Sequence, residues 1–263
     1  MIDIFNPENL DAYFQPIVDM KNMKVVGFES LIRGINRENG EILSPKILFE
    51  KAKKDKVITE FDRLCRELAF KKYKEFGLDK DYFLYVNISS EAVDSFSIGT
   101  NWIKRRLDYY GINPRLVVVE INEAKINITE NLLSVVKNYK EFGLNIAIDD
   151  FGTEHSNFDR LVYIDFNFLK LASVLIQDAD KNEKKLKMLE VMNFLAYKFD
   201  TYLIAEGIES FEEAKILSDL GINYHQGFFY CKPMSNPLEA INIVANILNN
   251  QLEDKLAKSL IIK

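Results

Sequence analysis

Two adjacent carboxylates end the mostly apolar segment at residues 145–150, and Gly152 follows closely. An apolar run that stops at a glycine is typical of a short strand, so Asp149 and Asp150 are expected at its C-terminal tip. Barrel enzymes carry their chemistry at this end of their strands. Two neighbouring acids repel by on the order of 1 kcal/mol even in water, which favours a cation beside them. The alternative is a turn or helix cap in which Asp only accepts hydrogen bonds.

Polar residues recur at or near the ends of the other segments that resemble strands. They are Gln15, Glu29, Asn87, Glu120, Asp149 with Asp150, Lys170, Glu206 and Gln226. Amides and charges that end or interrupt apolar strands this often favour function over simple solvent exposure. The set is rich in oxygen ligands and has no thiolate or imidazole, which matches Mg²⁺ or Mn²⁺. Two such ions about 3.5 to 4 Å apart on a shared Asp would promote phosphodiester hydrolysis.

Length and composition limit the alternatives. The 263 residues, 48% of them hydrophobic, can form one α/β barrel or two small domains. The formal charge of -6 disfavours a grip on polymeric nucleic acid, although it leaves room for a small phosphate ligand. Cys65 and Cys231 lack metal-site spacing, and two histidines offer little for a catalytic triad. Without a membrane-span pattern or a basic N-terminal region, we expect a cytoplasmic protein.

Short strand-like runs alternate with helical patterns and no linker interrupts them, which favours one α/β domain over residues 1–263. Strands are expected near 12–18, 24–32, 82–88, 115–121, 143–150, 166–171, 201–206 and 222–229. Helices are expected near 45–54, 57–76, 101–110, 130–142, 183–199, 211–220 and 237–257. The first two strands are too close in sequence for a helical crossover, so they should form an antiparallel hairpin. A barrel built from these runs would have one reversed strand.

Eight short motifs follow one another in order from about residue 12 to residue 235. They are Gln15-Pro-Ile, Glu29-Ser-Leu31 with Arg33, Val86-Asn87-Ile-Ser89, Glu120-Ile-Asn-Glu123, Asp149-Asp-Phe-Gly-Thr153, Leu169-Lys170, Glu206-Gly-Ile-Glu209 and Gln226-Gly-Phe-Phe-Tyr-Cys-Lys-Pro233. This series resembles that of the EAL-domain cyclic-di-GMP phosphodiesterases. The resemblance implies a modified TIM (β/α)8 barrel with an antiparallel first strand. It also implies hydrolysis of cyclic-di-GMP to linear pGpG with two Mg²⁺ or Mn²⁺ ions, whereas Ca²⁺ would bind without supporting catalysis.

The resemblance also implies roles for individual residues. One ion would be held by Glu29, Asn87, Glu120 and Asp149, and the second by Asp149, Asp150 and Glu206. Lys170 would orient the nucleophilic water, and Gln226 would help to hold it. Glu209 would support the site, and Glu123 would anchor the loop after Asp150. The cyclic dinucleotide would contact Gln15, Leu31 and Arg33, with Arg33 at a phosphate.

The sequence departs from the family pattern at several positions. Ser30 replaces Ala, Asn122 replaces Thr, Glu154 replaces Gly and Ala172 replaces an acid. The acid missing at Ala172 predicts a poorly anchored Lys170, and Glu154 alters the loop that couples metal binding to dimerisation. Both departures predict slow turnover. Three functions therefore stay open: an active phosphodiesterase, a cyclic-di-GMP receptor without efficient turnover, and an interaction module. The implied partners are a second copy of the chain and a sensor or cyclase carried by another chain.

Overall fold

The computed structural model describes residues 3–37, 39–89, 93, 102–122, 128–153 and 158–261. The strands are β1 (Leu10–Asp19), β2 (Lys24–Ile35), β3 (Ile42–Leu43), β4 (Phe83–Ile88), β5 (Val117–Asn122), β6 (Asn145–Phe151), β7 (Phe168–Leu171), β8 (Tyr202–Ala205) and β9 (Tyr224–His225). The helices are α1 (Pro45–Lys54), α2 (Ile58–Glu75), α4 (Trp102–Tyr110), α5 (Glu130–Glu141), α6 (Asp159–Tyr163), α7 (Ser173–Ile176), α8 (Glu183–Lys198), α9 (Phe211–Asp219) and α10 (Pro237–Ile261). Short 3-10 turns lie at Pro7–Asn9, Pro114–Leu116 and Ala179–Lys181.

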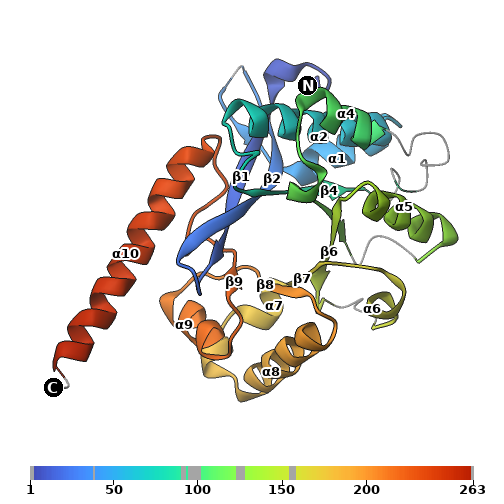
Figure 1. The fold of residues 1–263 in the computed structure, drawn as a ribbon. Coiled ribbons are helices and arrows are strands. Elements are labelled where there is room, and N and C mark those ends of the chain that lie inside the picture. The colour runs from blue at the N-terminus through green and yellow to red at the C-terminus, as the bar shows by residue number, and fades with distance from the viewer. Residues whose placement is uncertain are drawn as a thin grey trace.

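These strands close into a barrel surrounded by helices (Figure 1). Within the described ranges they form one nine-stranded sheet in the order β1-β9-β8-β7-β6-β5-β4-β2-β3, and β1 also pairs with β2. Without the two-residue β3, the other eight described strands therefore complete a ring. Neighbouring strands from β2 through β4 to β9 are parallel, which brings their carboxyl ends to one rim.

The first strand is reversed, as the short connection predicts. β1 pairs antiparallel with β2 from Leu10–Gly34 to Asp19–Lys24, and antiparallel with β9 at Val18–His225 and Asp19–Tyr224. The expected modified TIM barrel with an antiparallel first strand is thereby confirmed. The hairpin fixes the register that places Gln15 opposite Glu29.

The prediction of a strand over residues 222–229 is mostly wrong, because only Tyr224 and His225 pair with neighbouring strands. The chain leaves the sheet after Gln226, whose backbone N–H still donates to the Ala205 carbonyl. Gly227 then packs against the backbone of Ile208, where a Cβ would lie 2.0 Å from the Ile208 oxygen. A close approach between two loops therefore replaces the end of the strand. The short helices α6 and α7 and the strand β3 were also not expected from the sequence.

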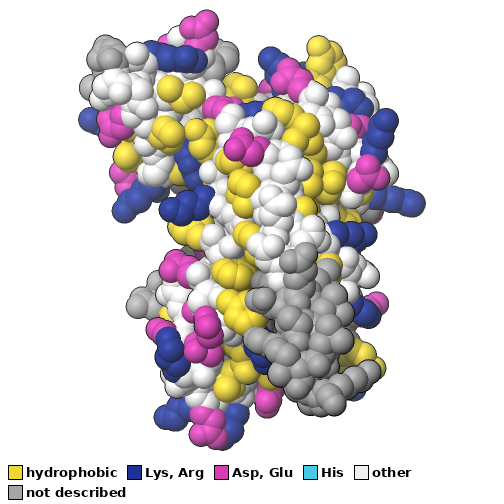
Figure 2. All heavy atoms as spheres, turned by 90° about the vertical axis from the view of Figure 1, so that its left-hand side faces the viewer, with side chains coloured by type: hydrophobic (Ala, Val, Ile, Leu, Met, Phe, Trp, Pro, Cys, Tyr) yellow, Lys and Arg dark blue, Asp and Glu magenta, His cyan; other side chains and the backbone are white. Residues whose placement is uncertain are grey.

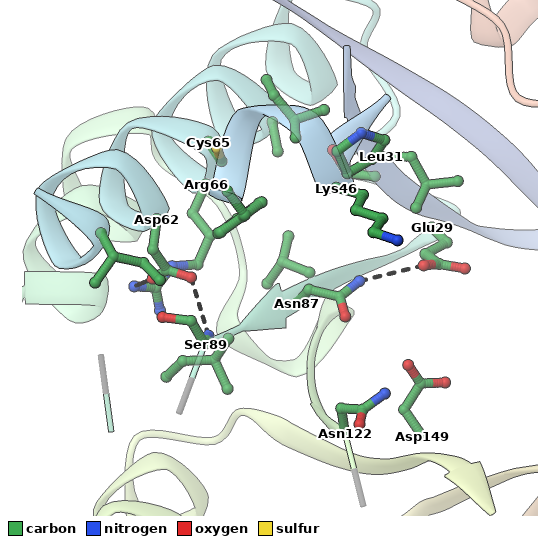
Figure 3. A pocket seen from close by; sticks show the side chains of 18 of the residues that line it. Glu29, Leu31, Lys46, Asp62, Cys65, Arg66, Asn87, Ser89, Asn122 and Asp149 are labelled. Carbon is green, nitrogen blue, oxygen red and sulfur yellow. Dashed lines mark hydrogen bonds and ion pairs between the residues drawn. The ribbon is translucent and has the colours of Figure 1, made fainter. Parts of the chain in front are cut away.

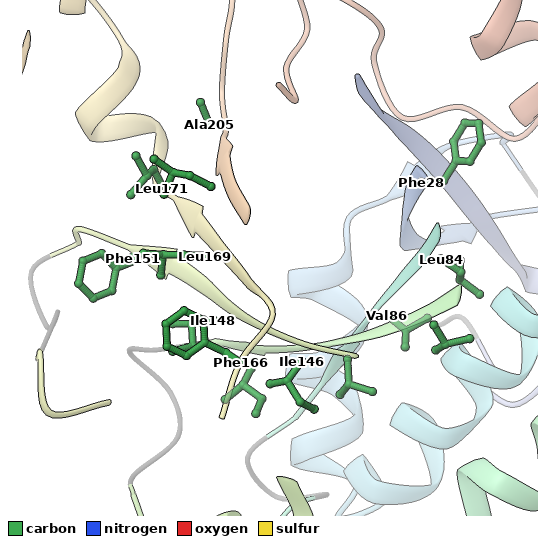
Figure 4. Packing of buried hydrophobic residues seen from close by; sticks show 14 of the residues in the cluster. Phe28, Leu84, Val86, Ile146, Ile148, Phe151, Phe166, Leu169, Leu171 and Ala205 are labelled. Carbon is green, nitrogen blue, oxygen red and sulfur yellow. The ribbon is translucent and has the colours of Figure 1, made fainter. Parts of the chain in front are cut away.

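Outward-facing strand residues and the inner faces of the helices form the main hydrophobic core. Figure 4 shows part of it, with Val86, Ile146, Ile148, Leu169 and Leu171 pointing away from the barrel interior. The helix α9 begins with the capping box formed by Ser210 and Glu213. α10 packs along β1 and β2, and its C-terminal half extends past the barrel (Figure 1).

The surface carries both signs of charge. On the face shown in Figure 2, blue and magenta side chains are interspersed, with no broad field of positive charge. In the part of the chain that the structure describes, every helix is too short or too polar to cross a membrane. Cys65 and Cys231 are both free thiols.

His225 anchors the strand next to Gln226. A carbonyl can only accept, so Nε2–H donates to the Ile222 oxygen at 2.9 Å, and Nδ1 accepts from the Tyr230 hydroxyl at 2.7 Å. Burial lowers the pKa of His225 to about 4, although the Ile222 carbonyl favours the charged form. The neutral imidazole is therefore part of the fold.

This anchor predicts a loss of stability in mild acid. In the unfolded chain His225 is protonated below its ordinary pKa of 6.5, whereas in the folded chain it stays neutral down to about pH 4. Acid between these two values therefore favours the unfolded state. We expect about 3 kcal/mol less unfolding free energy at the acid end of this window. Urea unfolding of wild type and His225→Gln between pH 7 and pH 4.5 measures the difference. A His225 ring signal in NMR that titrates near pH 6.5 in the folded protein would contradict the assignment.

Candidate active site

The candidate site lies inside the barrel, near the rim formed by the carboxyl ends of the parallel strands. One layer deeper in the barrel lies a cluster of apolar residues, Ile17, Tyr85, Val118, Ala147, Phe168 and Ile204. Strand residues two positions apart point to the same side, so the next interior residues toward the rim can be read from the sequence. In the same order they are Gln15, Asn87, Glu120, Asp149, Lys170 and Glu206. Period-two alternation thus places one polar side chain from each of these strands above an apolar floor.

Lys170 lies at the centre of this layer and is only 1% exposed. The carboxylate oxygens nearest to its Nζ are Glu120 Oε1 at 2.5 Å, Glu206 Oε1 at 2.5 Å, Asp149 Oδ1 at 3.2 Å and Glu29 Oε2 at 3.3 Å. The ammonium therefore connects side chains from β2, β5, β6 and the end of β8. Several acids and one buried base are held together in a space that excludes most water.

The expectation that Lys170 is poorly anchored without an acid at position 172 is wrong. β7 ends at Leu171, and Ala172 is the N-cap of α7, so residues 170 and 172 do not continue along one strand face. Carboxylates from other strands hold Lys170 instead. The replacement at Ala172 consequently gives no reason to expect slow turnover.

Burial and repulsion from neighbouring acids raise the pKa values of Glu120 and Glu206. Burial raises the pKa of Glu120 well above its usual range, and the negative charge of Glu29 adds to the shift. Burial also raises the pKa of Glu206 to about 8. For Lys170 burial alone would lower the pKa, but the surrounding carboxylates, first Asp149, raise it well above its usual value. The single ammonium of Lys170 cannot neutralise all of the surrounding carboxylates, so excess negative charge remains in a low-dielectric space.

The acids fit divalent cations. Carboxylate oxygens of Asp149, Asp150 and Glu206 all lie within 4.8 Å of one another. Among the described residues, Glu120 Oε1 and Asp149 Oδ1 accept no well-directed hydrogen bond, although both face the Lys170 ammonium. Buried carboxylate oxygens gathered in this way are suitable ligands for Mg²⁺ or Mn²⁺. The donor set thus agrees with metal binding.

Asn87 contributes an amide at the edge of this cluster. Its Nδ2 donates to Glu29 Oε1 at 3.2 Å (Figure 3). It also donates to Glu120 Oε2 at 2.9 Å. As a metal ligand Asn87 would have to turn the amide so that Oδ1 faces the acids, because only the oxygen can coordinate a cation.

Two glutamines form the opposite edge of the site. Gln226 Nε2 donates to Glu29 Oε2 at 2.7 Å and to Gln15 Oε1 at 3.2 Å. Gln15 Nε2 in turn donates to the Cys231 carbonyl at 3.2 Å. These bonds fix the orientation of both amides. Gln226 Oε1 is buried and has no hydrogen-bond partner in the described part of the structure, so it is available to a water or ligand donor.

Two cavities meet at the acidic cluster. The larger, of about 620 Å³, extends between β2, β4, α1 and α2 and has largely apolar walls that include Leu31. The smaller, of about 250 Å³, is lined by Gln15, Gln226 and other polar groups. Both cavities are lined by Glu29 and Asp150. The acids therefore lie between two spaces of different character.

The remaining site predictions differ in position. Glu209 is exposed and lines the smaller cavity. Arg33 donates to the Ile32 carbonyl at 3.0 Å and its guanidinium lies 5.6 Å from the Tyr13 ring centroid. It lies outside both cavities as the described residues define them. Glu123 and Glu154 lie outside the described residues, and their implied roles stay predictions.

Three residues of the larger cavity were not singled out from the sequence. Arg66 donates from Nη2 to Asp62 Oδ2, and the Ser89 N–H donates to Asp62 Oδ1 at 3.0 Å. An Asp and an Arg four residues apart can pair on one helix face, but α2 carries many other charged residues, so the sequence did not single out this pair as the buried one. Lys46, in the first turn of α1, directs its ammonium toward the Glu29 side of the cavity (Figure 3). Nothing in the local sequence indicated that orientation.

Fold and site together define an α/β-barrel protein with a lysine-centred acidic site suited to divalent cations. The family model described as the EAL domain matches residues 4–233, and the chain therefore belongs to the EAL domain family. The resemblance carried by the eight motifs is thereby confirmed.

Curated relatives match over most of this chain. The probable cyclic di-GMP phosphodiesterase PdeB of Escherichia coli K12 is 25% identical over 233 residues, which are 88% of this chain and 44% of PdeB. The signaling protein YkoW of Bacillus subtilis is 28% identical over 228 residues, which are 84% of this chain and 28% of YkoW. This chain thus spans less than half of the length of either relative.

Solved structures share the fold. The calcium and cyclic-di-GMP complex of BlrP1 from Klebsiella pneumoniae superposes with a TM-score of 0.79 at 25% identity, covering 89% of this chain and 58% of BlrP1. The cyclic-di-GMP complex of the PaMucR phosphodiesterase superposes with a TM-score of 0.80 at 21% identity, covering 89% of this chain and 96% of PaMucR.

The position of Lys170 predicts a metal-dependent effect on stability. Lys170→Met removes the buried cation and leaves the carboxylates facing one another, so we expect a loss on the order of 3–5 kcal/mol of unfolding free energy in EDTA. Added Ca²⁺ should recover more stability in this variant than in wild type, because the ion takes over the role of the ammonium. Urea unfolding with EDTA and with Ca²⁺ measures both effects.

Lys215→Met is the matched control, since Lys215 pairs with Asp219 at 2.5 Å on the surface. Exposed pairs contribute at most about 1 kcal/mol. Equal losses for Lys170→Met and Lys215→Met in EDTA would show that Lys170 does not hold the acids together.

Proposed function

We propose that the chain hydrolyses cyclic-di-GMP to linear pGpG with two divalent cations, Mg²⁺ or Mn²⁺. The observation that carries the proposal is the cluster of carboxylates from separate strands around Lys170. Membership of the EAL domain family, the activity named for PdeB and the ligands named for BlrP1 support the choice of substrate.

The two cavities suit a cyclic dinucleotide. Such a molecule carries two nucleosides on a phosphodiester ring, and a phosphate near Glu29 and Asp150 would leave room for nucleosides on either side. The larger cavity offers apolar walls such as Leu31 to a base, whereas the smaller one offers the amides of Gln15 and Gln226. The division into an apolar and a polar space supports a ligand of this shape.

Within this proposal the acids have two overlapping tasks. One ion would be held by Glu29, Asn87, Glu120 and Asp149, and the other by Asp149, Asp150 and Glu206. When bound, the ions would neutralise phosphate charge and lower the pKa of a water molecule. The carboxylates would hold the ions close to the position of the phosphate through their negative charge.

The remaining polar groups position a nucleophile. Lys170 is fixed by its carboxylate contacts, and once bound ions take over some of these carboxylates an N–H of its ammonium can donate to a water or phosphate oxygen. Gln226 Oε1 can accept from the same water, because its Nε2 is already used by Glu29 and Gln15. Glu209, at the rim of the smaller cavity, would support this arrangement from the outside.

A receptor that binds cyclic-di-GMP without hydrolysis is the second candidate. Lys170 already compensates part of the negative charge with direct contacts to the acids, which is compatible with binding without ions. Product analysis of cyclic-di-GMP incubated with the purified chain in Mg²⁺, Mn²⁺ or EDTA decides between the two functions. Linear pGpG in the metal reactions alone supports hydrolysis, and unchanged cyclic-di-GMP in all three supports the receptor.

The metal assignment predicts that Asp149→Asn and Glu29→Ala each abolish metal-dependent turnover. Each change removes a formal charge from the acidic cluster, and loss of a metal ligand costs far more than the roughly 1.4 kcal/mol that a tenfold rate change represents. Circular dichroism should show that both variants remain folded. Turnover within about tenfold of wild type in either variant would exclude the assignment.

Arg33 tests the ligand assignment separately. A guanidinium can grip a phosphate through two parallel hydrogen bonds that an ammonium cannot reproduce, so Arg33→Lys should weaken cyclic-di-GMP binding about tenfold. To reach the ligand, Arg33 would leave its place over the Tyr13 ring. Calorimetry in Ca²⁺ measures binding without relying on hydrolysis, and an unchanged affinity would remove Arg33 from the site.

A further inference from the structure

Asn122 ends β5 directly beside the paired acids of β6. In the parallel ladder it is the partner of Asp149, and its side chain is 7% exposed. Asn122 Nδ2 donates to Asp150 Oδ2 at 2.5 Å. A bond from a buried amide to a carboxylate is charge-assisted and stronger than one between neutral groups. Asn122 therefore restrains the position of the Asp150 side chain.

The backbone at Asp150 is in a conformation that requires support. Its φ is +59°, in the left-handed region that costs a non-glycine residue about 1 kcal/mol or more. The register between β6 and β7 shifts between Ile148 and Phe151, which makes residues 149 and 150 a bulge. In a regular strand, neighbouring side chains point to opposite faces, but the bulge brings Asp150 toward Asp149 and Glu206.

The acids brought together by this bulge repel one another. Oxygens of Asp149, Asp150 and Glu206 lie within 4.8 Å, so a movement of the Asp150 carboxylate toward solvent would lower the repulsion. Asn122 opposes that movement with a hydrogen bond, and as a neutral group it adds no charge that would compete with a cation.

Stability alone does not explain the orientation of Asn122. Because a carboxylate only accepts hydrogen bonds, the contact with Asp150 requires Nδ2 on that side, and Oδ1 is left buried. This oxygen has no hydrogen-bond partner among the described residues. A buried unsatisfied acceptor costs roughly 1–3 kcal/mol. An apolar side chain would avoid that cost but would lose the hold on Asp150.

We propose that Asn122 is a positioning residue for the second divalent cation, holding Asp150 beside Asp149 and Glu206. This inference rests on the proposed function for the identity of the ions. It adds a residue outside the ligand set, one that acts through Asp150. The cluster should therefore form without Asn122, but with Asp150 less well placed to bind an ion.

The test is calorimetric titration of Mn²⁺ into wild type, Asn122→Ala and Asn122→Thr, with Asn145→Ala as the control. Asn145 Nδ2 donates to the Arg115 carbonyl at 2.8 Å, at the opposite end of β6. The control thus loses an amide hydrogen bond from a neighbouring strand without touching the site. The readout is the affinity of each ion, measured in the absence of substrate.

We expect wild type and Asn145→Ala to bind two ions with equal affinities. Asn122→Ala should keep the first ion and bind the second at least tenfold more weakly. Asn122→Thr has a hydroxyl that can donate over a shorter reach, so its affinity for the second ion should lie between those of wild type and Asn122→Ala. This variant provides the test if Asn122→Ala does not fold. Turnover of cyclic-di-GMP by Asn122→Ala should need at least tenfold more Mn²⁺ for half-maximal kcat, with KM within twofold of wild type.

A purely structural role would give a different pattern. Urea unfolding in EDTA would then show a loss for Asn122→Ala while both Mn²⁺ affinities stay equal to wild type, and that result overturns the proposal. If wild type binds two ions but yields no pGpG, only the proposed function fails, because the titration still measures the effect of Asn122. If wild type binds no Mn²⁺, both fail.

Discussion

The contact between the Lys170 ammonium and the surrounding carboxylates is the interaction on which the candidate site depends. Its partners come from strands far apart in the sequence, and they meet only because the barrel is closed. The apolar layer below, with Tyr85 and Phe168, keeps water away from one side. In this environment each charge strongly affects its neighbours, which is why burial raises the pKa values of Glu120 and Glu206. The same environment would bind a divalent cation more strongly than a solvated cluster of acids could.

Much of this arrangement can be predicted from local sequence patterns. Alternation of apolar and polar residues identifies which strand positions face the interior, and the carboxyl ends of parallel strands meet at one rim. Asn87, Glu120, Asp149 and Lys170 can therefore be grouped from the order of residues along the chain. The reversed first strand also follows from a local constraint, because the short connection before Lys24 cannot accommodate a helix.

Features that depend on contacts between distant segments were not predictable in the same way. The early end of the last strand results from Gly227 packing on Ile208, which neither segment reveals alone. The anchoring of Lys170 could not be predicted from the sequence, because the missing acid at Ala172 is a local feature whereas the carboxylates that hold the ammonium lie across the barrel. The left-handed backbone of Asp150 arises from a shift in register between β6 and β7. Each of these features depends on a contact with another segment of the chain.

Closure of the barrel also sets the order in which the protein can acquire its site. β1 can pair with β2 as soon as the first residues of the chain have been made. Its other edge can pair only when Tyr224 and His225 are present, and the bridge between Phe14 and Met234 forms later still. Gln15 and Gln226, separated by 211 residues, meet only at this step. On the ribosome the barrel therefore stays an open sheet with two unpaired edges until nearly the whole of it has been synthesised. A nascent chain interrupted before β9 would carry most of the acids without the seam that encloses them, and its exposed edges would mark it for chaperones or proteases.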